Sequence, residues 1–267
     1  MRLRTKTVML GFTVSILATT IAHAGLLATD GAEPVEAKHA EVELNGSYLY
    51  DKSKNSGITT KSDSTDGDIT VTAGIVKRLD IAVGLPYTSN AREKVNGELT
   101  SRSEGLNDMT VDFKYQFMEM NGLKLAIKPG VILPTGNTSK GLSDGHAGFA
   151  VALLGTGEFA EGKLLLHANA GYVSHNYKDV AVKNFSHGEV FNVSIACEAE
   201  IVEGLKLAAD TGIATNTDRA SNTLPVYALV GAKYEFNKHL EGYAGIRFGL
   251  SKPEADSTAL FGAVLKF

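Results

Sequence analysis

The sequence has few of the residues that would suggest a disulfide-stabilised or nucleic-acid-binding protein. Its 267 residues include one cysteine, Cys197, and no tryptophan. A single cysteine cannot form an internal disulfide bond, so the fold must be stabilised by other interactions. The formal net charge is −4, and without a basic excess the chain lacks the electrostatic attraction that nucleic-acid binding requires. Only 6 prolines accompany 28 glycines, and with recurring Thr, Val, Leu and Tyr this composition favours β-strands.

The N-terminus has the three parts of a secretory signal peptide. Arg2, Arg4 and Lys6 precede an apolar run over residues 8–21, and small residues surround His23 at the end. The run is shorter than the roughly 20 residues that a membrane-spanning helix needs. We therefore predict a signal peptide at residues 1–24, cleaved near Ala24. The rest of the chain has no apolar run of about 18 residues, which argues against helical membrane spans.

The mature chain divides into a short tail and one domain. Residues 25–39 mix small, acidic and apolar side chains without a period of 2 or 3.6, so we expect a periplasmic tail. From residue 40 to residue 267, segments of roughly ten residues alternate apolar and polar side chains, which is the period of a strand with two different faces. We expect twelve strands, at residues 40–51, 68–77, 80–87, 108–117, 123–133, 148–158, 163–173, 189–199, 205–214, 224–236, 241–250 and 257–267.

The lengths of the connections favour a membrane barrel over a soluble sandwich. Connections after odd strands are longer, as at 52–67 and 88–107, whereas those after even strands are tight turns, as at 78–79 and 118–122. Outer-membrane barrels have long extracellular loops and short periplasmic turns. An open sheet edge cannot persist in lipid, so the first and last strands must pair. The predicted fold is all-β: a transmembrane antiparallel up-and-down β-barrel of about 12 strands in the outer membrane of a Gram-negative-type bacterium.

Aromatic residues lie near the strand ends on the apolar face. We expect two girdles at the membrane interfaces, formed by Tyr50, Tyr87, Phe149, Tyr172 and Phe191 on the loop side and by Tyr115, Phe117, Tyr234, Phe236 and Phe267 on the turn side. The terminal Phe267 also resembles the ending of barrels that the β-barrel assembly machinery recognises. We predict that Phe267 acts as an assembly signal.

The polar face carries many ionisable residues, and these are the candidate lumen-lining residues. They are Asp108, Asp112, Lys114, Lys124, Lys128, His167, Glu198, Lys206, Asp210, Lys233 and Arg247. Confined charges need partners or water, so two interpretations stand: interior ion pairs that brace the wall, and a polar pore lining. Both can hold together. Many neighbouring inward positions are Gly or Ala, which favours a narrow passage over a plugged barrel.

Catalytic and metal-binding interpretations are weaker. An outer-membrane hydrolase would need a serine and a histidine on the lipid-facing side, whereas His167 faces inward and the other histidines of the mature chain fall in the tail, loops or a turn. Asp63, Asp66 and Asp68 do not have the spacing of a calcium loop. His175 and His187 lack further metal ligands. We expect no catalytic residue, metal or cofactor, and we expect Cys197 on the lipid-facing side.

Four short motifs suggest a family. They are Gly84-Leu85-Pro86-Tyr87; Gly105-Leu106-Asn107-Asp108 followed by Lys114-Tyr115; Leu133-Pro134-Thr135-Gly136; and Leu166-His167 with Asn169-Ala170-Gly171-Tyr172. In this order, over about 90 residues, they resemble the family of phenol meta-pathway outer-membrane transporters. The resemblance implies a barrel that passes small compounds, with aromatic or hydrocarbon compounds among the candidates.

The leading functional hypothesis is a passive outer-membrane channel, whose partners are membrane lipid, a small-molecule solute and the assembly machinery. The alternative is a structural or adhesive barrel that presents its loops to a partner. An outer-membrane hydrolase is the third hypothesis.

Overall fold

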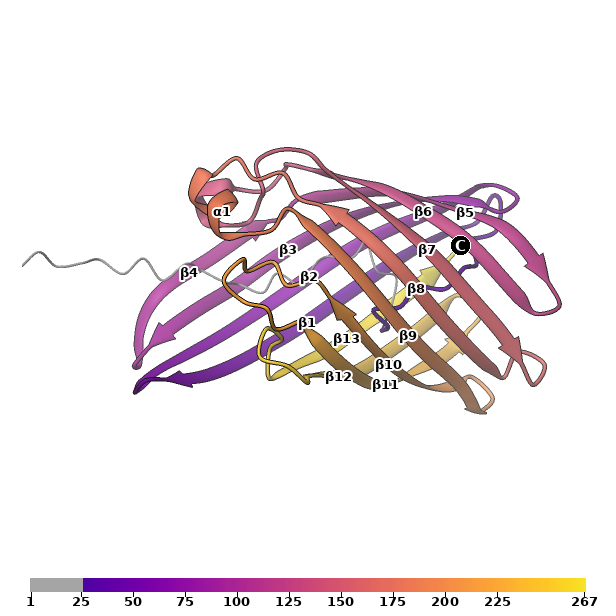
Figure 1. Ribbon diagram of the computed structural model, residues 1–267. Coiled ribbons are helices and arrows are strands. Elements are labelled where there is room, and N and C mark those ends of the chain that lie inside the picture. Colours follow the sequence, from indigo (N-terminus) through magenta and orange to yellow (C-terminus); the bar gives the residue numbers. More distant parts are fainter. Residues whose placement is uncertain (1–25) are drawn as a thin grey trace, which may run out of the picture.

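A computed structural model describes residues 26–267, so the predicted signal peptide and its cleavage site lie outside the described residues. The described chain forms strands joined by short turns and loops, with one 3-10 helix, η1 (Thr138–Lys140), and one short α-helix, α1 (Val180–Phe185) (Figure 1). The strands are β1 (Ala40–Asn55), β2 (Ile58–Val76), β3 (Leu79–Val95), β4 (Glu98–Leu106), β5 (Met109–Met120), β6 (Leu123–Leu133), β7 (Gly148–Phe159), β8 (Leu164–Ser174), β9 (Glu189–Val202), β10 (Leu205–Ala214), β11 (Val226–Asn237), β12 (Leu240–Gly249) and β13 (Ser257–Lys266).

These strands form one closed antiparallel barrel. Each strand pairs with its sequence neighbour, except that β5 pairs with β3, and β1 pairs with β13 to complete the ring. Within residues 26–267 the ring contains twelve strands, and β4 is an extra strand that extends beyond the ring on β3. The main chain of Phe267 exchanges two hydrogen bonds with Ala40, at 2.8 and 3.3 Å. The predicted closure between the first and last strands is confirmed.

The expected strands are all present, but two expected loops are wrong. Residues 52–67 and 88–107 are largely continuations of β1, β2, β3 and β4, which meet in tight hairpins at Ser56-Gly57 and Asn96-Gly97. All four turn residues have positive φ, as a two-residue hairpin of type I′ requires. These extensions carry polar side chains on both faces. Their sequence therefore lacks the alternation that marks a strand with one apolar face.

The two surfaces of the barrel differ as the alternation predicts. Large apolar side chains are exposed around its outside, including Leu44, Phe113, Leu153, Val193 and Phe261, while charged side chains of the same strands are buried inside. Phe149, Tyr172 and Phe191 form a contiguous aromatic row on β7, β8 and β9, with ring centroids 5.7 and 4.9 Å apart. Within residues 26–267, no helix combines the length and apolarity needed to cross a membrane.

The connections separate the two ends of the barrel. Figure 1 shows α1 and β4 at one end, and tight turns together with the C-terminus toward the other. One such turn is Asn121-Gly122 between β5 and β6, where both residues have positive φ. We call the end with α1 and β4 the loop end, and the opposite end the turn end.

Candidate functional site

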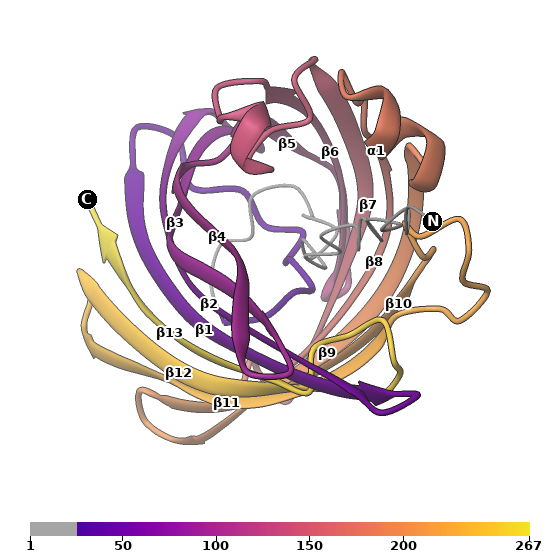
Figure 2. The ribbon, with the colours of Figure 1, turned by 90° about the vertical axis from the view of Figure 1, so that its left-hand side faces the viewer.

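The segment that precedes β1 lies inside the barrel. Residues 26–37, which we call the inner segment, have no regular secondary structure apart from one bridge between Ala37 and Gly74. Figure 2, which looks along the ring, shows this indigo part of the chain within it. The expectation of a free tail is wrong for these residues. Apolar side chains of the inner segment pack against apolar side chains of the wall, and its acidic side chains pair with lysines in the lumen. The segment has no regular period, so sequence periodicity does not reveal it.

Asp30 is the central ion-pairing residue of the inner segment. Its carboxylate accepts hydrogen bonds from Lys114 Nζ at 3.0 Å and from Lys128 Nζ at 2.7 Å. Burial by itself would raise the pKa of Asp30, but the two ammonium groups outweigh it and hold this pKa well below its usual range. All three side chains are buried. Asp30 is therefore ionised in a site where removal of its charge would leave the lysines poorly compensated.

The main chain of Asp30 is also bound. In the orientation that satisfies its amide group, Asn169 donates to Asp30 O at 3.0 Å and accepts from Asp30 N at 2.6 Å. The neighbouring Thr29 donates to Asp210 through both its main-chain N, at 2.9 Å, and its Oγ1, at 2.8 Å. Tyr227 OH donates to the same carboxylate at 3.0 Å. Buried polar groups of the inner segment thus have partners on the wall.

A second group of wall residues connects the inner segment to β8 and β9. Thr156 Oγ1 accepts from Ala32 N and lies 2.9 Å from His167 Nδ1. His167 Nε2 in turn lies 3.7 Å from Glu198 Oε1, which accepts from Lys233 Nζ at 2.8 Å. His167 is thus a wall residue that holds the inner segment through Thr156, and it does not face the lipid as a hydrolase of the predicted kind would require.

Nearer the turn end, the inner segment is held by a lysine and an aspartate. Lys124 Nζ forms ion pairs with Glu33 and, at 2.6 Å, with Glu158. Val35 N donates to Asp80 at 2.8 Å. Hydrogen bonds and ion pairs therefore follow the inner segment along most of its length.

Apolar contacts also hold the inner segment. Leu26, which is 2% exposed, fills a cradle between β11 and β12, because a Cβ atom added at Gly231 or Gly245 would lie 2.7 or 2.6 Å from its methyl groups. Ala32 belongs to a buried cluster with wall residues of β6, β7, β8 and β9. The small inward residues do leave space, as the sequence predicts, but the inner segment occupies part of it. The sequence did not predict that a segment of the chain lies in this space, and the width of the passage that remains stays a prediction.

Gly74 on β2 marks the place where the inner segment turns toward β1. Gly74 N donates to His39 O and Lys38 N donates to Gly74 O, both at 3.0 Å. A Cβ atom at Gly74 would lie 1.9 Å from Glu36 O, and its three nearest atoms all belong to Val35 and Glu36. Only glycine permits this close approach of the two backbones.

The remaining lumen candidates do not contact the inner segment in the same way. Arg247 lies 3.7 Å over the ring of Tyr227 and pairs with Glu254 at 2.8 Å. Lys206 is half-buried on β10, opposite Lys233 in the sheet register.

Asp112 and Asp108 have different environments from each other. Asp112 is buried on β5, and its Oδ1 occupies the space where Gly130 on β6 lacks a side chain. Asp108 lies at the loop end, where it accepts from the main-chain N of Gly136 and Asp144, both at 3.0 Å. Asp108 therefore orders the loop around η1.

The metal-binding interpretations gain no support from the geometry. Within residues 26–267, no group of three or more His, Cys, Asp or Glu side chains is arranged to hold a metal ion. Asp63 pairs with Arg92, Asp66 with Ser64 and Thr88, and Asp68 with Asn45 and Thr70. His175 pairs with Asp144 at 2.7 Å.

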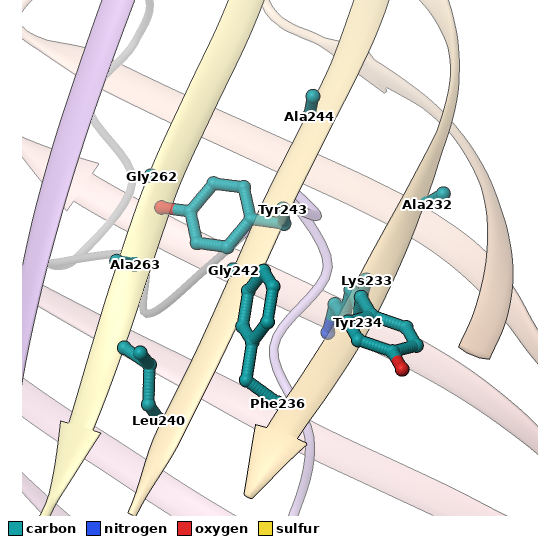
Figure 3. A pocket seen from close by; sticks show the side chains of 10 residues that line it. All are labelled: Ala232, Lys233, Tyr234, Phe236, Leu240, Gly242, Tyr243, Ala244, Gly262 and Ala263. Carbon is teal, nitrogen blue, oxygen red and sulfur yellow. The ribbon is translucent and has the colours of Figure 1, made fainter. Parts of the chain in front are cut away.

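A depression of about 490 Å³ lies outside the lumen, on the outer surface of β11, β12 and β13 (Figure 3). The exposed rings of Tyr234 and Phe236 border it, and Gly242 leaves it open. Lys233 is its charged lining residue, and the ammonium group of this lysine is paired with Glu198 inside the wall. The depression therefore offers an apolar surface to lipid and lacks the convergent polar groups of a solute site.

The alternation of apolar and polar residues does not identify the residues of the inner segment, above all Asp30, Thr29 and Leu26. Two signals were present. Adjacent leucines, Leu26 and Leu27, are unusual in a free tail, and three inward lysines on the neighbouring strands β5 and β6 exceed the acids of those strands.

A family model described as "Putative MetA-pathway of phenol degradation" matches residues 20–267. This chain belongs to that family. The resemblance predicted from the four motifs is confirmed. No curated protein matches the chain.

Several solved structures share this fold. An outer membrane channel from Pseudomonas putida F1 is 15% identical, with a TM-score of 0.71 over 88% of this chain and 98% of the channel. The translocator domain of the autotransporter NalP from Neisseria meningitidis is 14% identical, with a TM-score of 0.55 over 87% and 90%. The NanC porin is 11% identical, with a TM-score of 0.56 over 85% and 100%. At these identities the likeness establishes the fold.

Several residues of the family-like motifs hold the inner segment. Lys114 binds Asp30, Asn169 binds the main chain of Asp30, and His167 supports Thr156, which binds Ala32. The motifs therefore contribute to the contact between wall and inner segment as well as to the strands themselves.

Proposed function

We propose that the protein is an outer-membrane channel through which small molecules pass by diffusion, and that the inner segment controls this passage. One observation carries the proposal: a closed barrel with an apolar outside has ionisable side chains throughout its inside. A barrel that served only as an anchor would not need a lumen with so many charges, since burying charges is costly. Passive passage needs no energy source and no catalytic residue.

The inner segment supplies the means of control. It is bound by hydrogen bonds, ion pairs and apolar contacts, and within residues 26–267 its only covalent connection to the ring is at its β1 end. Displacement of the segment would leave the ring closed, because the pairing of β1 with β13 does not involve residues 26–37. The lumen can therefore widen without unfolding of the barrel.

Gly74→Val tests both parts of this proposal. The added side chain clashes with Val35 and Glu36 and with no wall atom among its nearest contacts, so it should displace the inner segment. In planar bilayers and in liposome uptake assays, the variant should pass ions and small neutral solutes more readily than the wild type, by about tenfold if the docked state is destabilised by about 1.4 kcal/mol.

Gly67→Ala is the matched control for Gly74→Val. It alters a glycine of the same strand, and its added Cβ would meet its nearest atom, Asn45 O, at an ordinary 3.6 Å. This control should behave as the wild type. Absence of both conductance and uptake in the wild type and in Gly74→Val would contradict the channel function.

The proposed channel function also requires a class of solute. The family description concerns phenol degradation, so small aromatic compounds are the first solutes to test in the uptake assay. Equal uptake of aromatic and aliphatic solutes of the same size would argue against an aromatic preference.

A second candidate function rests on the extensions of β1 to β4. They form two hairpins at the loop end, with exposed Ile58 and Leu99 near their tips, and could present a surface to a partner. Shortening both hairpins separates the two functions. Lost partner binding with unchanged permeability favours the anchor, and altered permeability favours the channel.

Phe267 fits the proposed outer-membrane location as an assembly signal. Its side chain is 66% exposed at the turn end, where the assembly machinery can bind it. Deletion of Phe267 should lower the amount of heat-modifiable barrel in cells more than it lowers transport per folded molecule. Normal barrel levels in the deletion variant would argue against the signal.

A further inference from the structure

The two lysines that bind Asp30 form a ready-made site for a carboxylate. Lys114 Nζ lies 3.0 Å from Asp30 Oδ1, and Lys128 Nζ lies 2.7 Å from Asp30 Oδ2, so each carboxylate oxygen has its own ammonium donor. Both lysines are nine-tenths or more buried, at 9% and 4% exposed. They come from adjacent strands, β5 and β6, and are positioned by the sheet as well as by the inner segment. Charge-assisted hydrogen bonds of this kind are among the strong polar contacts of proteins.

Apolar surfaces lie on both sides of this carboxylate along the inner segment. On one side, Ala32 packs in a cluster with Ala126, Ala150, Ala152 and Leu154. On the other side, Leu26 and Leu27 pack against Ala196, Ala208, Leu229 and neighbouring residues. When the inner segment leaves, these surfaces lose their cover together with the lysine pair.

We propose that Lys114 and Lys128 form a lumen site for small organic carboxylates with an apolar body, and that Asp30 occupies this site as an internal competitor. A solute carboxylate that takes the place of Asp30 displaces the inner segment, so the solute itself favours the open state. This inference deepens the proposed channel function and rests on it for its biological meaning. The binding site can be tested without transport.

Two other acids near Lys114 do not take the place of Asp30. Asp80 and Glu41 lie close enough to Lys114 to interact with it electrostatically. Asp80, however, accepts a hydrogen bond from Val35 N of the inner segment, and Glu41 lies on β1 near Lys266. Neither occupies the position between Lys114 and Lys128 that Asp30 holds.

Calorimetric titration of the full-length protein in detergent tests the site, with benzoate as the probe. Asp30→Ala removes the internal competitor and should bind benzoate about tenfold or more tighter than the wild type. Addition of Lys114→Met or Lys128→Met to Asp30→Ala should remove this gain. Benzyl alcohol, which lacks the charge, should bind all variants alike, and acetate, which lacks the apolar body, should bind Asp30→Ala more weakly than benzoate.

Several outcomes would overturn the proposal. These are equal benzoate affinity in the wild type and Asp30→Ala, no loss on replacing either lysine, and an equal gain for benzyl alcohol. Equal affinity of Asp30→Ala for acetate and benzoate would show that the site does not prefer carboxylates with an apolar body. Glu36→Gln, which alters an acid of the inner segment whose side chain is 88% exposed, should not create the gain.

A second variant protects the test against misfolding of Asp30→Ala. Gly74→Val should displace the inner segment by steric contact without substituting Asp30, Lys114 or Lys128. It should also bind benzoate more tightly than the wild type, and heat-modifiable mobility checks that each barrel is folded. Because calorimetry does not depend on conductance, benzoate binding without any conductance would refute the channel and retain the site. Conductance without benzoate binding would refute the carboxylate site and retain the channel function.

Discussion

The inner segment and the two hairpins at the loop end are both additions to a regular barrel, and they are opposite in character. The hairpins are paired β-strands, yet apolar side chains near their tips, Ile58 and Leu99, are 44% and 56% exposed. The inner segment has almost no regular structure, yet Leu26 and Ala32 are 2% and 0% exposed. The addition with regular backbone hydrogen bonds is thus exposed at its tips, whereas the addition without regular secondary structure is buried.

This difference shows where each addition gains its stability. The hairpins are stabilised by their own ladders and turns, and the exposed side chains at their tips contribute little. The inner segment depends on side chains of the wall for almost every contact, including ion pairs, hydrogen bonds that Thr156 and Asp210 accept, and a cradle at two glycines. Side-chain substitutions should therefore affect the inner segment strongly and the hairpins weakly.

Asp30→Asn should have the largest effect on the docked inner segment. It removes one charge of a buried ion-paired group, which costs about 3–5 kcal/mol when the partners stay buried. Hydrogen exchange of the amides of residues 26–37 should accelerate by two or more orders of magnitude, on the scale of about 1.4 kcal/mol per factor of ten. Glu36→Gln is the control, because the side chain of Glu36 is 88% exposed. Unchanged exchange in Asp30→Asn would show that the ion pair does not hold the segment.

Leu26→Ala should have the next largest effect. It empties the cradle formed by Gly231 and Gly245, and replacement of a buried leucine by alanine costs about 2–5 kcal/mol. The same exchange measurement should detect release, concentrated in residues 26–29 and smaller toward Ala37. Leu250→Ala, at a residue that is 62% exposed, should leave the inner segment protected. Protection that persists in Leu26→Ala would assign the docking to the polar contacts alone.

The sequence predicted the barrel because its period-2 alternation reports the two faces of each strand. All twelve ring strands, their antiparallel closure and the exposed aromatic rows on the outside follow from that alternation. The hairpin extensions were missed since both of their faces are polar. The Asn96-Gly97 pair was the available signal, because this dipeptide favours a two-residue hairpin.

The sequence predicts which charged residues face the lumen but not which partners they have. Alternation places Lys114, Lys128 and Asp210 on the inward face, and they are buried there. It cannot say which partner each charge has, because Asp30 and Thr29 come from a segment without any period, more than 80 residues away from Lys114 and 181 from Asp210. Partners of this kind are fixed by tertiary structure.

The pH dependence should separate the inner segment from the loop that carries α1. The pKa of Asp30 is lowered in the docked state by Lys114 and Lys128, against the opposing effect of burial. The stabilising contribution of Asp30 is therefore complete above the ordinary pKa of an aspartate. It is lost only as the pH falls through the lowered pKa of Asp30 in the docked state. The inner segment should stay docked from pH 8 down to about pH 4. Exchange protection lost between pH 6 and pH 5 would implicate another group.

The loop that carries α1 should lose stability at alkaline pH. Burial and the nearby carboxylate of Asp144 raise the pKa of Tyr177 to about 12, and its hydroxyl donates to His187 O at 3.3 Å. A raised pKa gives stability that is present below the ordinary tyrosine value, near pH 10, and is lost as the pH rises through about 12. Proteolysis of residues 175–188 should increase over that interval in the wild type. Tyr177→Phe, which cannot ionise, should lack the transition.

Leu99→Ser should have the smallest effect of all. Leu99 lies near the tip of the β3–β4 hairpin and is 56% exposed, so the substitution removes little buried surface and leaves the ladder to β3 intact. The free energy of unfolding should change by no more than about 0.5 kcal/mol, and exchange of the inner segment should not change. A chemical denaturation series measures the first quantity. A loss comparable to that of Leu26→Ala would mean that the hairpins, like the inner segment, are held by their side chains, and the contrast between the two additions would fail.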